Sequence, residues 1–190
     1  MYGPVIEGSQ FRLRPPCSED AEVMISWFED MEVTSRLKVV FPFSLDAERE
    51  WLRRAAEDKD RILWVIEHEG RPVGTTSIHG IDWANQHGST GTAIGDKTAW
   101  GKGIAREMMR LRADFAFTQL PLRKLKSAYL EGNEASRRAQ VAAGYREVGR
   151  LHQEIFRDGR WLDSIVTELL REDWERVRAA QRSGPTGTPT

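Results

Sequence analysis

The residues best suited to chemistry lie in one glycine-rich stretch, Ile94-Gly95-Asp96-Lys97-Thr98-Ala99-Trp100-Gly101-Lys102-Gly103-Ile104-Ala105. Apolar spacing predicts a strand before this turn and a helix directly after it. A turn of this kind directs backbone N–H groups outward together at the positive end of the helix dipole, which suits phosphate. The stretch therefore predicts an anion site built from the backbone.

Two familiar phosphate motifs do not fit this stretch. A P-loop needs four residues between its first glycine and Gly-Lys-Ser/Thr. Here five residues separate Gly95 from Gly101, and Gly103 stands where a hydroxyl group would hold magnesium. A dinucleotide fingerprint needs a third glycine, and Arg106 occupies that place. Nucleotide hydrolysis and Rossmann-type binding are therefore disfavoured.

The elements around the turn alternate between strand and helix patterns, which predicts one mixed α/β domain. Glu69-Gly70 and Asp158-Gly159 are each expected to join two strands, because such pairs favour tight hairpins. Between these hairpins, a short strand over 91–95, the helix after the turn and a strand over 124–130 form a strand-helix-strand unit.

Capping residues mark where the helices begin and end. Ser18 and Asn133 are expected to cap two helices, because their side chains accept hydrogen bonds from free backbone N–H groups, and a further helix begins near Ser44. Gly144 is expected to end the Asn133 helix in a left-handed conformation, and Pro121 to end the helix after the glycine-rich turn.

The glycine-rich turn resembles the phosphate-binding turn of the GNAT superfamily of acyl-CoA-dependent N-acyltransferases, and within it the RimJ/RimL-like branch. The superfamily pattern is Gln/Arg-x-x-Gly-x-Gly/Ala at the start of a helix, and Gly103 and Ala105 match it. Trp100 departs from the first position, but a Trp-Gly-Lys-Gly run is frequent in this branch, where the backbone does the binding. The likeness continues in order through Arg12-Leu13-Arg14-Pro15, Ile81-Asp82-Trp83, Asn133-x-x-Ser136, Gly144-Tyr145, Phe156-Arg157-Asp158-Gly159-Arg160 and Leu170-Arg171-Glu172-Asp173-Trp174.

This resemblance implies a fold and a domain organisation. The fold is a GNAT-like α/β (α+β) arrangement: a mixed, mostly antiparallel sheet with a central splayed parallel strand pair, and helices on both faces. Residues 1–10 would form an N-terminal extension, 11–176 the acetyltransferase domain, and 177–190 a helix end and a disordered polar tail, whose composition can bury nothing.

The resemblance also implies an activity and a co-substrate. Members transfer an acetyl group from acetyl-CoA to an amine by direct attack of the neutral amine, without a covalent acyl-enzyme. A backbone N–H near Ile94 would polarise the acetyl carbonyl as an oxyanion hole. The residues expected to contact CoA are Ile94, Gly95, Trp100, Gly101, Lys102, Gly103, Ile104, Ala105, Asn133 and Ser136.

The proton transfers of this reaction call for an acid and a base. Many members place a tyrosine seven residues after the asparagine, where this chain has Gln140. Some members of the RimJ/RimL-like branch also lack this tyrosine, and the resemblance to them implies that the serine of Asn-x-x-Ser, Ser136, is the candidate acid. The alternative is that Ser136 only hydrogen-bonds the backbone or the cofactor. Glu154 is the candidate base, unless a one-residue register change turns it away. An exposed amine that loses its proton through ordered water would need no base.

Three residues before the central strand, His79, Asp82 and Trp83, are expected to contact the acceptor. The alternative for each is a solvated loop position or a strand-end side chain without a role in binding. Arginines on the two helices after the turn are expected to supply one or two CoA phosphate contacts and otherwise a solvated face. They are Arg106, Arg110, Arg112, Arg137 and Arg138.

Composition narrows the class of protein further. The 190 residues include 28 Lys and Arg against 29 Asp and Glu, a net charge of −1, which gives no field to hold a nucleic acid. No apolar run reaches the roughly 20 residues of a bilayer helix. No signal peptide is visible and Cys17 is the single cysteine, so a cytoplasmic location is expected. The four histidines show no metal-ligand spacing, so no metal is expected.

The sequence therefore predicts an acyl-CoA-dependent N-acetyltransferase that acts on a primary amine, either a protein or peptide amino terminus or a small-molecule amine. Its expected partners are acetyl-CoA and the amine acceptor, with a homodimer left open and no nucleic acid or membrane. The alternative, prompted by Gln140, is a catalytically inactive module that binds CoA or regulates.

Overall fold

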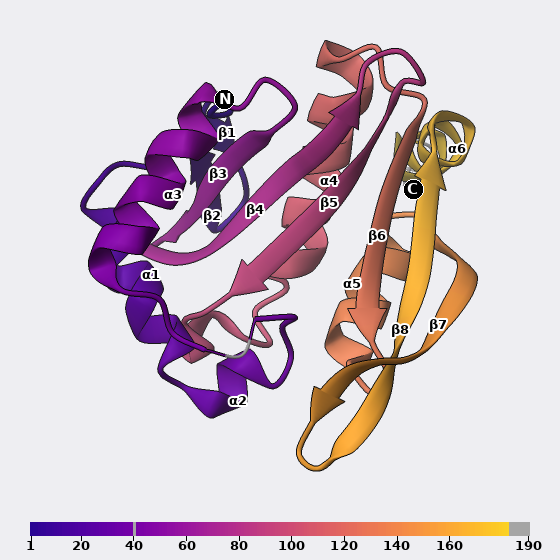
Figure 1. Ribbon diagram of the computed structural model, residues 1–190. Coiled ribbons are helices and arrows are strands. Elements are labelled where there is room, and N and C mark those ends of the chain that lie inside the picture. The colour runs from indigo at the N-terminus through magenta and orange to yellow at the C-terminus, as the bar shows by residue number, and fades with distance from the viewer. Residues whose placement is uncertain (40, 183–190) are drawn as a thin grey trace, which may run out of the picture.

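Eight strands form one sheet in the order β1-β2-β3-β4-β5-β6-β8-β7 (Figure 1). The computed structural model describes residues 1–39 and 41–182, the last two without their side chains. Neighbouring strands are antiparallel except for the central pair, β5 and β6, which confirms the predicted mixed sheet. The strands are β1 (Ile6–Glu7), β2 (Phe11–Arg14), β3 (Ile62–His68), β4 (Arg71–Asp82), β5 (His87–Ile94), β6 (Lys124–Leu130), β7 (Arg146–Arg157) and β8 (Arg160–Leu170).

Helices cover both faces of the N-terminal half of the sheet (Figure 1). On one face α1 and α3 form a core with Leu63 of β3, and on the other α4 forms a second core with the next residue, Trp64. Successive side chains of a strand point to opposite faces, so β3 is buried on both sides. The helices are α1 (Asp20–Phe28), α2 (Met31–Thr34), α3 (Leu45–Glu57), the 3-10 helix η1 (Lys97–Ala99), α4 (Ile104–Gln119), α5 (Glu134–Ala142) and α6 (Arg171–Arg182).

The predicted hairpin turns are confirmed. Glu69 and Gly70 have φ angles of 52° and 76°, and Asp158 and Gly159 have 49° and 74°. Two consecutive positive φ angles are the signature of the tight turn that matches the twist of paired strands. These turns fix the register of β3 on β4 and of β7 on β8 at their connected ends.

Most of the predicted helix ends are confirmed as well. The Ser44 side chain accepts from Ala47 N at the start of α3, and Gly144 follows α5 with a φ of 96°. The Ser18 cap is wrong: α1 is preceded by Glu19, which makes no side-chain cap. Asp20 is instead drawn into an ion pair with Arg14 at 2.7 Å, which fixes the start of α1 against β2.

The central strands separate along their length, as Figure 1 shows. β5 and β6 pair only from His87 to Ser89 and from Lys124 to Lys126, and then diverge. The parallel pair is therefore splayed, as predicted. β5 itself is longer than the expected strand over 91–95, because its small residues pair with β4 along almost their whole length.

The two ends of the chain differ from a simple extension and tail. Ile6 and Glu7 pair with β2, and the N-terminal ammonium group donates to Ala55 O at 2.6 Å, so the first ten residues join the sheet and α3. At the other end α6 continues to Arg182. Of the predicted helix end and disordered tail over 177–190, residues 183–190 lie outside the described residues.

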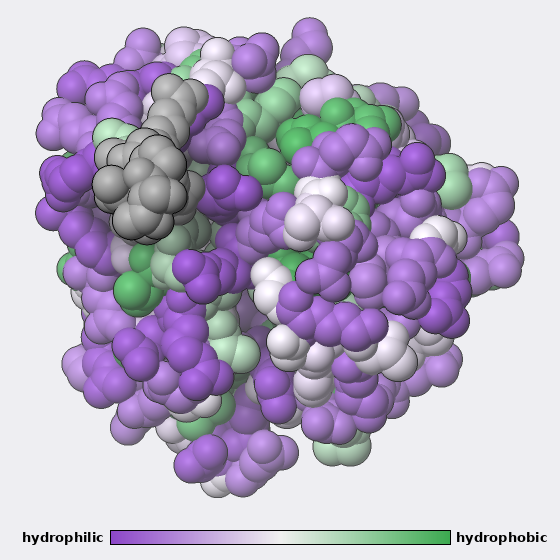
Figure 2. All heavy atoms as spheres, turned by 180° about the vertical axis from the view of Figure 1, so that it is seen from behind, coloured by the Kyte–Doolittle hydropathy of each residue, from purple (hydrophilic) through white to green (hydrophobic). Residues whose placement is uncertain are grey.

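The surface away from the view of Figure 1 is mostly hydrophilic. Figure 2 shows hydrophobic residues there only in small separate groups. Within residues 1–39 and 41–182, no helix has the length and apolar character needed to cross a bilayer.

Candidate active site

The splay divides the site between two arms. The N-terminal arm comprises β4, β5 and α4, and the C-terminal arm comprises β6, β8 and α5. On the first arm, Gly91 O accepts a hydrogen bond from Thr76 Oγ1 of β4 at 3.1 Å. The C=O and N–H groups of a trans peptide point in opposite directions, so Thr92 N–H is directed away from β4, toward the splay.

Ile94 presents a second N–H in the same direction. The carbonyl of Ala93 lies against Gly74 of β4, so the Ile94 N–H of that peptide faces the splay. A Cβ on Gly74 would lie 2.3 Å from Ala93 O, and a Cβ on Gly95 would lie 2.1 Å from Trp27 of α1. Glycine is therefore required at both positions to keep this end of β5 in place.

The glycine-rich turn leaves backbone donors free at the start of α4. Gly101 and Gly103 have φ angles of 76° and 81°, and Gly103 is the N-cap of α4 without a side-chain cap. The first N–H groups of α4 therefore remain open to an anion. Lys102 Nζ donates to His68 Nε2 at 3.2 Å, since His68 Nδ1 faces the carbonyl of Gln10 at 2.6 Å and must bear the proton.

Trp100 ties this turn to the end of β5. Its indole N–H donates to Ile94 O at 3.0 Å. The guanidinium of Arg36 lies over the indole ring, 4.4 Å from the ring centroid. The tryptophan side chain thus fixes the distance between the glycine-rich turn and the Ile94 peptide.

On the C-terminal arm a chain of neutral side chains leads to Ser136. Asn133 caps α5, as predicted, by accepting from Ser136 N at 3.1 Å. Gln140, which is 2% exposed, donates through Nε2 to Ser136 Oγ at 3.2 Å and accepts through Oε1 from Thr167 Oγ1 at 2.5 Å. Because Ser136 Oγ already accepts, its own proton is left to be donated elsewhere.

A short bridging segment after α2, residues 35–39, contacts both arms. Its Arg36 side chain lies over Trp100, while its backbone carbonyl accepts from Asn133 Nδ2 at 3.5 Å. Arg157, at the end of β7, donates to Leu37 O at 2.8 Å. The bridging segment therefore links the glycine-rich turn to the start of α5 and to the last hairpin.

His79 lies on β4 beside the first arm's peptides. Its Nδ1 is 3.2 Å from Ser77 Oγ, and a Cβ on Gly91 would lie 3.4 Å from its ring. Burial, followed by the charges of Arg61 and Arg112, lowers the pKa of His79 below its usual value. The imidazole is therefore neutral at neutral pH and able to accept a proton.

The predicted base, Glu154, lies on the exposed edge strand β7. It follows Gln153, whose φ of 52° marks the place where the pairing of β7 with β8 shifts register. The side chain is exposed. Its role as a base stays a prediction.

Asp82 and Trp83 lie in the turn between β4 and β5. Asp82 accepts from Asn85 N at 2.9 Å, and the Trp83 indole donates to Asp60 at 2.8 Å. This turn is at the end of β5 opposite Ile94, roughly 20 Å away at about 3.3 Å per residue. The structure thus brings His79, but not these two residues, close to the splay, and their contact with an acceptor stays a prediction.

The predicted exposure of one arginine is wrong. Arg112, expected on a solvated helix face, is only 1% exposed and belongs to the interior. A signal was available, because Arg112 follows Met108 by four residues and Met108 follows Ile104 by four, which is the spacing of one buried helix face. Arginine is usually exposed, but here the position on the buried face of the helix predicts burial better than the residue type does.

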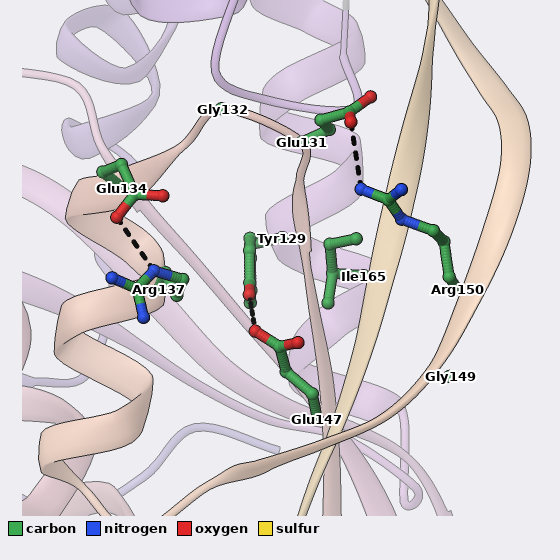
Figure 3. Close-up of a pocket in the computed structure, with 9 residues that line it drawn as sticks. All are labelled: Tyr129, Glu131, Gly132, Glu134, Arg137, Glu147, Gly149, Arg150 and Ile165. Carbon is green, nitrogen blue, oxygen red and sulfur yellow. Dashed lines mark hydrogen bonds and ion pairs between the residues drawn. The ribbon is translucent and has the colours of Figure 1, made fainter.

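A separate hollow of about 530 Å³ lies between α5 and β7 (Figure 3). Tyr129 and Glu147 point toward each other in it and form a hydrogen bond. Burial, then the Glu147 carboxylate, raises the pKa of Tyr129 to about 12, so the phenol remains a donor. Of the residues that the sequence analysis considers for CoA or acceptor contact, Arg137 lines this hollow and the other described ones do not. Its lining residues are Tyr129, Glu131, Gly132, Glu134, Arg137, Glu147, Gly149, Arg150 and Ile165.

In the part of the chain that the structure describes, no three His, Cys, Asp or Glu side chains are grouped as for a metal ion.

The chain is similar in sequence to known proteins. A family model described as an acetyltransferase (GNAT) domain matches residues 10–146. A relative named "Putative ribosomal N-acetyltransferase YdaF", from Bacillus subtilis (strain 168), is 30% identical over 138 residues, which are 70% of this chain and 75% of that protein.

Solved structures agree in fold. The spermidine N-acetyltransferase from Vibrio cholerae in complex with CoA and spermine has a TM-score of 0.81 and 21% identity, covering 88% of this chain and 99% of that chain. RimL, a ribosomal L7/L12 alpha-N-protein acetyltransferase in complex with CoA, has a TM-score of 0.78 and 14% identity, covering 87% and 97%. The chain belongs to the GNAT acetyltransferase family and is an N-acetyltransferase.

Proposed function

We propose that the protein transfers the acetyl group of acetyl-CoA to a primary amine by direct attack. The observation that supports this most is the pair of N–H groups at Thr92 and Ile94, which face the splay just before a backbone anion site. These donors lie about 7 Å apart along the extended strand, so one can bind the developing oxyanion while the other holds the pantetheine arm. The amine nitrogen bonds to the thioester carbon, the C–S bond breaks, and the thiolate is left to be protonated.

The residues present fit the phosphates and the pantetheine arm of CoA. The free N–H groups at the start of α4 suit the pyrophosphate, with Gly101 and Gly103 allowing close approach of the backbone. Asn133 and Ser136, at the start of α5, lie on the opposite arm of the splay. These residues would hold the co-substrate between the two arms.

Ser136 would supply the proton for the leaving thiolate. Its oxygen accepts from Gln140, so its hydroxyl hydrogen is the group that points to another acceptor. The Ser136 oxygen recovers a proton from water when the reaction is complete. Gln140 therefore does not replace the absent tyrosine as an acid but prepares the serine.

His79 would accept the proton that the attacking amine loses. It is neutral, partly buried and next to Gly91 on the first arm. We expect His79→Gln to lower kcat/KM by about a hundredfold or more, the lower range of general-base effects. Glu154→Gln measures the other predicted base in the same assay, and a larger loss in that variant would reverse the assignment.

The acceptor would be a peptide amino terminus or a small-molecule amine. The named relatives include a ribosomal-protein acetyltransferase and a spermidine acetyltransferase, which are one of each kind. A cytoplasmic location and a homodimer remain part of this proposal, and light scattering in solution tests the second.

Thiol release from acetyl-CoA, measured over a panel of amines, tests the proposed function. The panel holds peptides with free amino termini, polyamines, amino acids and aminoglycosides. Saturable thiol release with one class supports the proposal. Calorimetric binding of acetyl-CoA without release for any class would favour the inactive CoA-binding module, and no binding at all would overturn both.

A further inference from the structure

The most unusual buried group outside the proposed acid and base is the guanidinium of Arg112. It projects from α4 into the interior and is 1% exposed. Among the described residues no carboxylate lies within ion-pair distance of it, and its Nε has no hydrogen-bond partner. An unpaired buried cation opposes folding, so a role other than stability explains it better.

Among the described residues, this guanidinium donates its hydrogen bonds to the N-terminal arm. Its Nη1 donates to Gly91 O at 3.0 Å, to Thr76 Oγ1 at 2.6 Å and to Thr92 Oγ1 at 2.9 Å. The Gly91 carbonyl already accepts from Thr76 Oγ1 at 3.1 Å. The cation is therefore not needed to satisfy that carbonyl.

The contacted peptide is the one that presents Thr92 N–H to the splay. A cation bound to the oxygen of a peptide draws electron density toward that oxygen and makes the N–H of the same peptide a stronger donor. The positive charge itself also favours negative charge that develops nearby in a poorly solvated site. Both effects act on the carbonyl oxygen of the thioester while the amine attacks.

From this geometry we infer that Arg112 is a positioning residue for the transfer reaction, which polarises the Gly91–Thr92 peptide and strengthens the oxyanion hole. The inference rests on the proposed function, because it needs an oxyanion at Thr92 N–H. Arg112 touches no substrate and acts through the peptide. It stabilises the transition state more than bound acetyl-CoA, because only the transition state bears the full negative charge.

The test compares Arg112→Met with Arg112→Lys in the full-length protein. Methionine has a similar length and no charge, so we expect kcat to fall about tenfold to hundredfold, less than for a lost oxyanion donor because the Thr92 N–H itself remains. The KM for acetyl-CoA should change less than about threefold. Thermal unfolding should be unchanged or shifted upward, because an unpaired buried charge is removed. Lysine keeps the charge and should retain more of the rate.

A spectroscopic signature separates polarisation from mere packing. Isotope-edited infrared of bound acetyl-CoA, labelled at the thioester carbonyl, should show a lowered stretching frequency in the wild type. In Arg112→Met the frequency should return toward that of free acetyl-CoA. Arg53→Met, on the exposed face of α3, should change neither the frequency nor kcat.

The outcomes distinguish the two levels of the proposal. If the wild-type protein releases no thiol with any amine, the proposed function fails. If the wild type is active and Arg112→Met keeps its kcat and carbonyl frequency, only the inference about Arg112 is overturned. A fall in kcat accompanied by a lower melting temperature and an unchanged carbonyl frequency would also overturn the inference about Arg112, since that pattern indicates a structural role.

Discussion

The two arms of the splay differ in the side chains that support them, and in the proposed reaction each arm serves a different half. On the N-terminal arm the buried cation of Arg112 binds the carbonyl of the Gly91–Thr92 peptide, whose N–H faces the splay. On the C-terminal arm an uncharged chain of hydrogen bonds runs from Thr167 through Gln140 to the Ser136 hydroxyl. A nearby positive charge stabilises a developing oxyanion. A proton donor depends more on the direction of its hydrogen bond than on the electrostatic potential around it.

The two arms also differ in which positions tolerate substitution. The N-terminal arm depends on backbone positions, with glycines at 74 and 95 that admit no side chain. The C-terminal arm depends on side chains whose removal leaves the backbone in place. Substitutions at Gly74 and Gly95 should therefore affect both folding and activity, and substitutions of the side chains on the C-terminal arm mainly activity.

Gly74→Ala should have the largest effect of all. The new Cβ would lie 2.3 Å from Ala93 O, so β4 or β5 must move and the Ile94 N–H with it. We expect a loss of roughly 2–4 kcal/mol in the free energy of unfolding and more than about a hundredfold in kcat/KM. Denaturant unfolding and the thiol-release assay measure the two effects.

Gly70→Ala is the matched control for that change. Gly70 has a φ of 76°, but a Cβ there would meet nothing within 4 Å. The Gly70→Ala variant should lose about 1 kcal/mol in the free energy of unfolding, because alanine is strained at this φ, and should keep its kcat. Equal activities in the two variants would contradict the role given to β5.

Ser136→Ala should come next, through the C-terminal arm. We expect kcat to fall by about a hundredfold, the lower bound for a lost general acid. The cap of α5 survives because it uses Ser136 N rather than the hydroxyl. An unchanged kcat would show that the thiolate leaves without this proton and that Ser136 only binds.

Gln140→Met should have a smaller effect that depends on Ser136. Losing one neutral hydrogen bond that orients the hydroxyl should lower kcat by about fivefold to tenfold. In a Ser136→Ala background the same change should lower kcat by less than about twofold, because there is no hydroxyl to orient. Full additivity in this double-mutant cycle would mean that Gln140 acts on packing alone. Thr167→Val, which frees the amide to rotate, should resemble Gln140→Met.

The features that were predicted correctly from the sequence depend on short-range backbone geometry. The Glu69-Gly70 and Asp158-Gly159 turns and the Asn133 cap depend on neighbours a few residues away, and all three are confirmed. The Ser18 cap failed because a tertiary ion pair between Arg14 and Asp20 fixes the start of α1.

The chemistry behind the site depends on distant pairs and was harder to predict. The four-residue spacing of Ser136 and Gln140 was visible in the sequence, but Thr167, which orients the amide, comes 27 residues later in the chain. Only the pairing of β6 with β8 brings Thr167 under α5. Arg112 was misread for a related reason, since its partners Thr76 and Gly91 are on strands that precede it by many residues.

The smallest expected effect concerns the pH dependence of stability. It tests whether the charge of Arg112 influences the pKa of His79 as well as the Gly91–Thr92 peptide. Burial, with the charges of Arg61 and Arg112, lowers the pKa of His79 below 6.5. Between the lowered value and 6.5 the unfolded chain binds more protons at this residue than the folded protein does. The free energy of unfolding contributed by His79 should therefore rise with pH through that window and level off above 6.5. His79→Gln should remove this slope, as measured by denaturant unfolding at several pH values. Arg112→Met should reduce the slope without abolishing it, because burial remains the larger cause. A slope that is the same in all three proteins would show that the field of Arg112 does not extend to His79.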